Sequence, residues 1–244
     1  MTKIFIDAGH GGKDPGAVGQ GLQEKDLTLI ISKKVGDLLK KHDLDIYYSR
    51  TTDIFLDLTT RANKANNINA DIFISFHINS ATNAAARGFE IWTTRGKTES
   101  DDIAEVVALQ FMKDFPSVPF RSDKSDGDLD KESNFTVITK SKMPAILLEL
   151  GFIVNAQDAQ MLRTQQDKIA NTIANGILNY LKITPNSGIK LNIKGIDITA
   201  NGYFKNNTNY IKIGKHDVTV RELAEALNLK DVSWDNKNQI VIMK

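Results

Sequence analysis

Four residues of this sequence have the types and positions that metal-assisted hydrolysis requires: His10, Glu24, His77 and Glu149. His10 and His77 each end a predicted buried strand, so their imidazoles would converge if the two strands are neighbours in an open sheet. Glu24 precedes the first predicted helix, and its carboxylate could complete a shell of two nitrogens and one oxygen. Such a shell is typical of catalytic zinc, with a fourth position open for water.

Glu149 is the one acid in the apolar run Ile146–Phe152. Burying a charged carboxylate is costly, so we expect its pKa to rise toward the range of a general base or acid. Structural interpretations stay open for the other three residues. A histidine after a strand is often a hydrogen-bonded residue, and an acid before a helix often stabilises the helix dipole.

The elements that must position these residues alternate between strands and helices. Apolar residues at 4, 6 and 8 predict a central first strand, which ends in a glycine-rich turn carrying His10. Further strands are predicted at 45–49, 71–77, 88–93 and 145–152, and helices at 27–41, 58–67, 103–111, 156–163 and 166–181. This order predicts an α/β fold, a mostly parallel twisted sheet with helices on both faces.

Several local details follow from residue type. Asp26 is the predicted N-cap of the first helix, and 135–138 reads as a short strand. The Gly- and Asp-rich segment 116–133 is expected to be a mobile excursion. Two arginines are expected to form structural ion pairs with acids near them in the sequence: Arg50 and Arg61, with Asp53 and Asp57.

The sequence predicts two domains. Thr184–Gly188 has the composition of a linker, and the pattern changes after it. We therefore predict a catalytic domain at 1–183, a linker at 184–188 and a small α+β domain at 189–244. The last segment combines alternating strand patterns with one helix near 219–227.

Composition excludes several classes of function. The chain has 244 residues, of which 41% are hydrophobic and 25% charged, as in ordinary soluble domains. A net charge of +1 gives no reason to expect nucleic acid as a partner, and the absence of cysteine excludes disulfides and thiolate chemistry. No apolar run is long enough for membrane insertion, and the first residues lack a signal-peptide core, so we expect synthesis without a Sec leader.

Five motifs follow one another along the chain: Asp7–Ala17, Glu24–Leu27, Ser49–Asp53, Ala70–Asn79 and Met143–Asn155. In order and spacing they resemble the zinc-dependent N-acetylmuramoyl-L-alanine amidases of the amidase-3 type. The resemblance covers about residues 1–182. It implies a hydrolase that cleaves the amide bond between N-acetylmuramic acid and L-alanine in peptidoglycan.

The resemblance also implies roles for single residues. His10, Glu24 and His77 would be the zinc ligands, and Glu149 the carboxylate that activates water. Asn79 and Glu90 are candidates for positioning the substrate or the ligands, with structural hydrogen bonding as the alternative. An enzyme of this class acts at the bacterial cell wall, as an autolysin or an endolysin. Without a leader it would be a phage lysin released through a holin pore, or a chain whose leader has been removed.

The tail carries three further segments, Val218–Leu227, Val232–Asp235 and Gln239–Met243. Together they are similar to the small "copper amine oxidase N-terminal-like" domains of bacterial wall proteins. His216 is the only histidine there, so we expect an exposed turn residue and no copper site. Wall binding or self-association is the expected role of this domain.

Two other classes of function remain open from the residues alone. Two histidines and a carboxylate also bind iron in non-haem oxygenases, but these are all-β proteins with a closely spaced pair of ligands. Here the candidate ligands lie 14 and 53 residues apart. An inactive wall-binding module is the second alternative, and a costly acid such as Glu149 in an apolar strand argues against it.

Overall fold

The computed structural model describes residues 1–123 and 127–183, and in the tail 189–193, 196–200, 202–205, 208–213, 216–227, 232–235 and 240–243. The chain divides into two compact units, Met1–Tyr180 and Leu181–Lys244. The predicted linker 184–188 lies outside the described residues.

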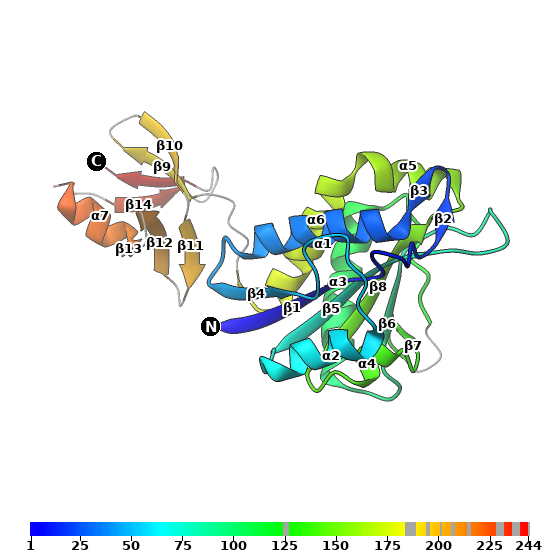
Figure 1. Cartoon of the computed structure of the whole chain (residues 1–244). Helices are drawn as coiled ribbons and strands as arrows, with labels where there is room; N and C mark the ends of the chain where they lie inside the picture. Colours follow the sequence, from blue (N-terminus) through cyan, green and yellow to red (C-terminus); the bar gives the residue numbers. More distant parts are fainter. Residues whose placement is uncertain are drawn as a thin grey trace. The chain divides into compact units, whose positions relative to one another are not determined.

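The first unit is built on a six-stranded sheet with the order β4-β1-β5-β8-β6-β7. The strands are β1 (Thr2–Ala8), β4 (Leu44–Tyr48), β5 (Ile72–Asn79), β6 (Glu90–Thr93), β7 (Lys131–Glu132) and β8 (Ala145–Phe152). The four strands β4, β1, β5 and β8 are parallel, whereas β6 pairs antiparallel with β8. A mostly parallel sheet with helices around it confirms the predicted fold class (Figure 1).

Helices cover both faces of this sheet. They are α1 (Glu24–Leu39), α2 (Leu58–Asn67), α3 (Glu99–Asp114), α4 (Thr136–Thr139), α5 (Ala156–Thr164) and α6 (Gln166–Tyr180). Helices α1 and α3 both pack on α6, and α2 packs on α4 (Figure 1). Phe5, Phe73 and Leu147 meet Ala65 of α2 and Val137 of α4 in one buried cluster. Because both faces are covered, the central strands are nearly continuous apolar runs.

The sheet determines where the site forms. Strands β1, β5 and β8 are parallel, so their carboxyl ends lie at one edge of the sheet. His10 follows β1, while His77 and Glu149 lie in the second halves of β5 and β8. A short hairpin, β2 (Val18–Gly19) and β3 (Leu22–Gln23), leads directly into α1.

Two local predictions are wrong, and the predicted excursion is structured in its described part. Residues 136–139 form the one-turn helix α4, although their β-branched residues favour a strand, because they pack against α2 and β8. Helix α1 begins at Glu24 with Gln23 as its N-cap, and Asp26 lies in its first turn. In the predicted excursion Phe120 forms a bridge with Phe89, and β7 extends the sheet, so its described part belongs to the fold.

The second unit holds both strands and a helix. Its elements are β9 (Ile189–Ile193), β10 (Ile196–Ala200), β11 (Gly202–Lys205), β12 (Thr208–Ile213), β13 (His216–Thr219), α7 (Val220–Ala226), β14 (Val232–Asp235) and β15 (Ile240–Met243). One sheet has the order β10-β9-β15-β14 and another β11-β12-β13. His216 begins β13 and pairs with Ile213, so the prediction of a turn residue is wrong.

Helix α7 begins with a capping box. The Glu222 amide donates to the Thr219 hydroxyl at 3.0 Å, and the Thr219 amide donates to the Glu222 carboxylate at 2.7 Å. These reciprocal bonds satisfy two amides at the helix start. Within the described part of the chain, no helix combines the length and the apolar character needed to cross a membrane.

Candidate metal centre

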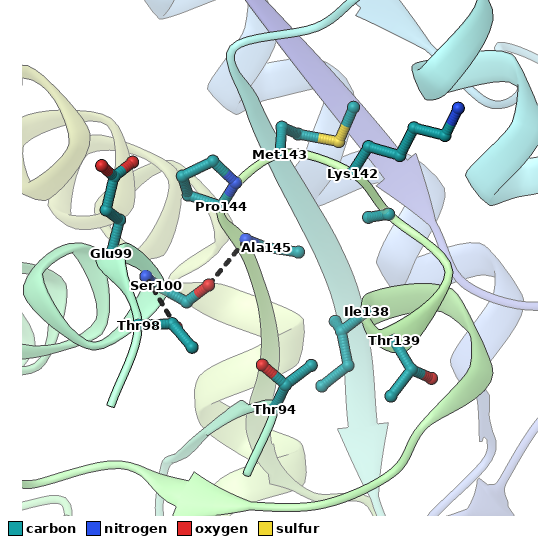
Figure 2. A pocket seen from close by; sticks show the side chains of 11 residues that line it. Thr94, Thr98, Glu99, Ser100, Ile138, Thr139, Lys142, Met143, Pro144 and Ala145 are labelled. Carbon is teal, nitrogen blue, oxygen red and sulfur yellow. Dashed lines mark hydrogen bonds between the residues drawn. The ribbon is translucent and has the colours of Figure 1, made fainter. Parts of the chain in front are cut away.

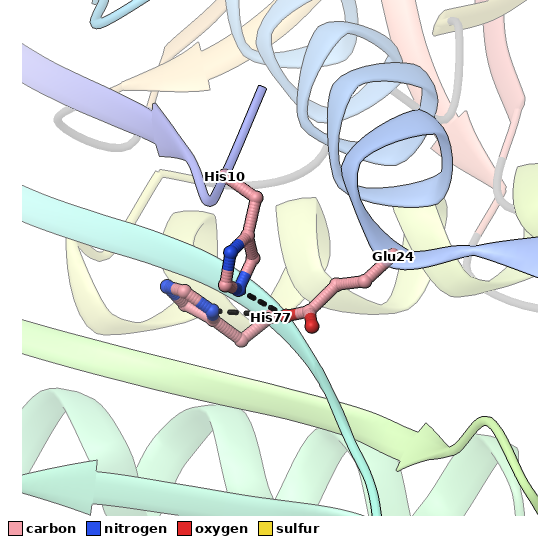
Figure 3. Close-up of side chains that lie close together, drawn as sticks. All are labelled: His10, Glu24 and His77. Carbon is pink, nitrogen blue, oxygen red and sulfur yellow. Dashed lines mark hydrogen bonds and ion pairs between the residues drawn. The ribbon is translucent and has the colours of Figure 1, made fainter. Parts of the chain in front are cut away.

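His10, Glu24 and His77 converge at the carboxyl edge of the sheet (Figure 3). One candidate ligand atom from each lies within 4.8 Å of the others. Oε1 of Glu24 is 3.1 Å from Nε2 of His10 and 3.0 Å from Nδ1 of His77. The imidazole centroids are 5.0 Å apart, with the rings nearly perpendicular. The structure therefore brings together the three residues that the sequence predicted as a group.

His10 is held in an unusual backbone conformation. Its φ of 59° lies in the left-handed region, which is unfavourable for a residue with a side chain and persists only where the surrounding structure holds it. Its Nδ1 lies 2.8 Å from a carboxylate oxygen of Asp14, which fixes the ring and leaves Nε2 facing Glu24. This hydrogen bond orients the imidazole in the way that carboxylate–histidine pairs do at metal sites.

Two buried arginines hold the backbone of the turn that carries His10. Arg50 donates to the carbonyls of Ala8 and Gly9, at 3.0 and 2.8 Å. Arg61 donates to the carbonyls of Ala8 and His10, at 2.5 and 2.6 Å. These bonds satisfy carbonyls that the tight turn removes from the sheet ladder.

The predicted ion-pair partners of these arginines are wrong. Arg61 pairs with Asp7, at 2.8 Å and fully buried, and not with Asp57, which caps α2. Asp53 pairs with Lys25 at 2.7 Å, whereas Arg50 donates mainly to backbone carbonyls. The signal that the prediction missed is Asp7 itself, because a charge inside a buried strand requires a partner.

Glu24 is fixed through both of its carboxylate oxygens. Oε2 accepts the amide of Ala17 at 2.8 Å, and Oε1 accepts the amide of Ile78 at 2.9 Å. Gly16, with φ of 64°, packs so tightly here that a Cβ would lie 2.5 Å from Oε2 of Glu24 and 2.7 Å from the His10 ring. A glycine is therefore needed at position 16.

Electrostatics favour an ionised Glu24. Burial disfavours its charge, but the hydrogen bonds and charges of His10 and His77 outweigh this and hold the pKa of Glu24 well below its usual range. Burial likewise lowers the pKa of His10, yet Glu24 and Asp14 together raise it above the ordinary value. The carboxylates of Glu24 and Asp14 therefore make the surroundings of the His10 imidazole negative, which suits a cation.

The donor set fits a zinc ion. Two imidazole nitrogens and one carboxylate oxygen are the three protein ligands of many catalytic zinc sites, and the missing fourth ligand leaves a position for water or substrate. In the part of the chain that the structure describes, this is the one such group of histidine and acidic side chains.

Glu149 lies beside this group on the neighbouring strand. In the register of the sheet His77 on β5 faces Glu149 on β8, and Glu149 faces Glu90 on β6. Its Oε2 is buried, with no hydrogen-bond partner among the described residues. Burial, with repulsion from Glu24 and Glu90, raises the pKa of Glu149 well above its ordinary value, as its apolar neighbours predicted.

A β-bulge follows Glu149. The pairing of β5 and β8 shifts between His77 and Asn79, because Asn79 pairs with Phe152 and β8 contains one extra residue. Gly151 lies in this bulge with φ of 138°, a conformation that glycine adopts without strain. Bulges redirect side chains and are frequent beside active sites.

Asn79 and Glu90, the two candidate positioning residues, contact each other. Nδ2 of Asn79 donates to Oε2 of Glu90 at 3.0 Å, and the Glu90 side chain is buried. Glu90 accepts further bonds from Trp92, Arg121 and Lys131. It is thus the centre of a polar network beside Glu149.

A separate cavity of about 460 Å³ opens at the amino end of β8, around Ala145. Figure 2 shows the hydroxyl groups of Thr94, Thr98, Ser100 and Thr139 around it. Glu149 and the carboxyl ends of β1 and β5 lie toward the other end of the parallel strands. The candidate metal centre is therefore distinct from this cavity.

The fold and the site together define a class first: an α/β protein in which two histidines and a carboxylate could hold a metal ion. Residues 4–179 match the sequence model of the Amidase_3 family, described as N-acetylmuramoyl-L-alanine amidase. The chain belongs to this family. The match confirms the predicted family. The mostly parallel sheet with its helices also differs from the all-β scaffold of the iron oxygenase alternative.

Known proteins resemble the chain over most of its length. It is 43% identical over 179 residues to the uncharacterized protein YqiI of Bacillus subtilis, covering 72% of this chain and 84% of YqiI. It is 38% identical to the sporulation-specific N-acetylmuramoyl-L-alanine amidase of the same organism, and the match covers 82% of this chain and 78% of that amidase. The crystal structure of an N-acetylmuramoyl-L-alanine amidase from Clostridium difficile 630 superposes with a TM-score of 0.68 at 36% identity. The match covers 74% of this chain and 97% of that amidase.

Proposed function

We propose that this chain is a zinc-dependent amidase of the cell wall, which hydrolyses the bond between N-acetylmuramic acid and L-alanine in peptidoglycan. Membership of the Amidase_3 family supports the reaction. The observation that carries the proposal is the convergence of His10, Glu24 and His77 next to Glu149, whose Oε2 has no partner among the described residues.

His10, Glu24 and His77 would hold the zinc ion. When bound, zinc polarises a carbonyl oxygen and lowers the pKa of water. The residues around the ligands keep them in place: Asp14 orients His10, while the amides of Ala17 and Ile78 orient Glu24. Such supporting contacts strengthen metal binding in known sites.

Glu149 would be the general base and then the general acid. Its Oε2 takes a proton from the water that attacks the lactyl carbonyl, and the same oxygen delivers it to the nitrogen of L-alanine as the carbon–nitrogen bond breaks. Burial of Oε2 raises the pKa of Glu149, which makes its carboxylate a stronger base toward water and its acid form able to hold the proton for the leaving nitrogen. Asn79 and Glu90 would position the groups around it.

Metal analysis tests the metal site. We expect about one zinc ion per chain, lost in His10→Ala and in His77→Ala, because two remaining ligands do not retain the ion. His216→Ala, which removes a histidine of the second unit, is the matched control and should keep the metal. Full zinc content in both site variants would rule out this centre.

Product analysis tests the reaction. Digestion of purified peptidoglycan should release new L-alanine amino termini without new reducing sugar ends. Activity should survive without oxygen and return when zinc is restored to chelated protein. New reducing ends would indicate a glycosidase, and dependence on iron and oxygen would indicate the oxygenase alternative.

The proposed domain organisation is a catalytic domain at 1–183, a linker at 184–188 and a small α+β domain at 189–244. The division into two compact units near Tyr180 supports it. The second domain would serve wall binding or self-association. The cell wall would be the place of action.

A further inference from the structure

Two cationic side chains lie beyond Glu149 as seen from the metal centre. Nε of Arg121 donates to Oε1 of Glu90 at 2.7 Å, and Nζ of Lys131 donates to the same oxygen at 2.9 Å. Glu90 faces Glu149 across the β6–β8 pair. The single Glu90 carboxylate thus forms ion pairs with both cations, and its one negative charge neutralises only one of the two positive charges.

Both cations are held in place yet remain accessible. The side chain of Arg121 is 43% exposed and that of Lys131 is 22% exposed, whereas Glu90 is buried beneath them. The Arg121 guanidinium lies 5.1 Å from the Phe152 ring, and the Lys131 ammonium lies 5.2 Å from the Trp92 ring. A buried acid and two aromatic faces therefore preorganise a pair of partly solvated cations, which is the arrangement that binds an anion well.

The distance from the reaction site limits which part of a substrate can reach this pair. Glu90 lies two strands from His77, about 10 Å at the usual strand spacing. An extended peptide advances about 3.3–3.6 Å per residue. A peptide that begins at the scissile amide would therefore reach the cations with its second or third residue.

We propose that Arg121 and Lys131 form a subsite for a carboxylate of the stem peptide and determine specificity for it. This inference rests on the proposed amidase function, since it takes the stem peptide as the substrate. The subsite distinguishes a stem whose second or third residue carries a free carboxylate from the same stem with that group amidated. The amide is neutral and gains neither charge pairing nor a bidentate bond with arginine.

Matched synthetic substrates test the subsite on the full chain. One is N-acetylmuramoyl-L-alanyl-D-γ-glutamyl-L-lysinamide with a free α-carboxylate on glutamate, and the other carries an amide at that carbon. We expect the wild-type protein to prefer the acid by about 10–100-fold in kcat/KM, the usual worth of a charged hydrogen bond. Arg121→Gln and Lys131→Gln should each reduce this preference, mainly through a higher KM for the acid.

Control variants distinguish a loss of substrate binding from a structural defect. Arg121→Lys keeps the charge and should keep part of the preference, while Arg95→Gln, at an exposed arginine after β6, should leave it unchanged. Equal losses on both substrates, or a wild-type protein without preference, would overturn the subsite. If the wild-type protein cleaves neither substrate nor peptidoglycan, the proposed amidase function itself fails.

Discussion

The environment of Glu149 separates it from the three candidate ligands. Glu24 is held by two imidazoles and two backbone amides, which favour its ionised form. Glu149 sits one strand away with a buried oxygen that lacks a partner among the described residues, and its neutral form is favoured. Two carboxylates in one site thus have opposite pKa shifts, the usual basis for different roles.

Glu149→Gln tests the role of the carboxylate. The amide keeps size and polarity but cannot accept the proton, so we expect turnover to fall by about 10²–10⁴-fold. Zinc content should stay unchanged, because Glu149 is not part of the converging group. Turnover and bound metal are the measurements. Normal turnover, or loss of zinc, would show that the role is assigned wrongly.

Glu149→Gln should also change how the stability of the metal-free protein depends on pH. The pKa of Glu149 is raised by folding, so its contribution to stability is present at acidic pH and is lost as pH rises through the folded pKa. Glu149→Gln should therefore be more stable than wild type at neutral pH, with the difference vanishing near pH 4. Thermal unfolding with chelator across pH 4–8 measures this.

At the scale of elements, α2 and β1 are joined by one buried ion pair. Arg61 of α2 and Asp7 of β1 are 2% and 0% exposed, and Asp7 also accepts the Ser75 hydroxyl of β5. Arg61 further reaches the carbonyl of His10. The pair thus connects a helix, two strands and the turn that presents a candidate ligand.

Removing the Arg61 guanidinium should strongly destabilise the folded protein. Arg61→Met leaves the Asp7 charge buried without its partner, so we expect a loss of about 3–5 kcal/mol in the free energy of unfolding. Adding Asp7→Asn should restore part of this loss, because the unpaired charge is then gone. Urea unfolding of metal-free protein measures both. A loss of only about 0–1 kcal/mol, as for exposed pairs, would contradict this account.

At the scale of the whole molecule, the candidate site lies entirely in the first compact unit. The four residues proposed to bind metal and transfer protons, His10, Glu24, His77 and Glu149, all precede Tyr180, where that unit ends. The core around β1, β5 and β8 is also contained within it. The first unit therefore contains what folding and the proposed reaction require.

A protein ending at Ile183 should fold, bind zinc and cleave a soluble muropeptide at a rate within about two-fold of the full chain. It should lose affinity for sedimented cell walls or change its oligomeric state, because 189–244 is the proposed targeting or association domain. Pull-down with walls and light scattering are the measurements. An insoluble product, or one identical to the full chain in every assay, would show that the boundary or its meaning is wrong.

The sequence alone predicted the candidate site residues and the class of fold, and the structure confirms the class of fold. Residue types at strand ends and the alternation of strand and helix patterns are local properties, so His10, Glu24, His77 and Glu149 could be selected and an α/β sheet predicted. The convergence of the first three is what such a pattern implies once β1 and β5 are neighbours.

Only the tertiary structure decided the contacts between distant segments. The antiparallel placement of β6 beside β8 brings Glu90, and with it Arg121 and Lys131, next to Glu149. The pairing of Arg61 with Asp7, and the helical form of 136–139, likewise depend on packing against other elements. Strand order and burial determine such contacts, and local residue preferences carry little information about either.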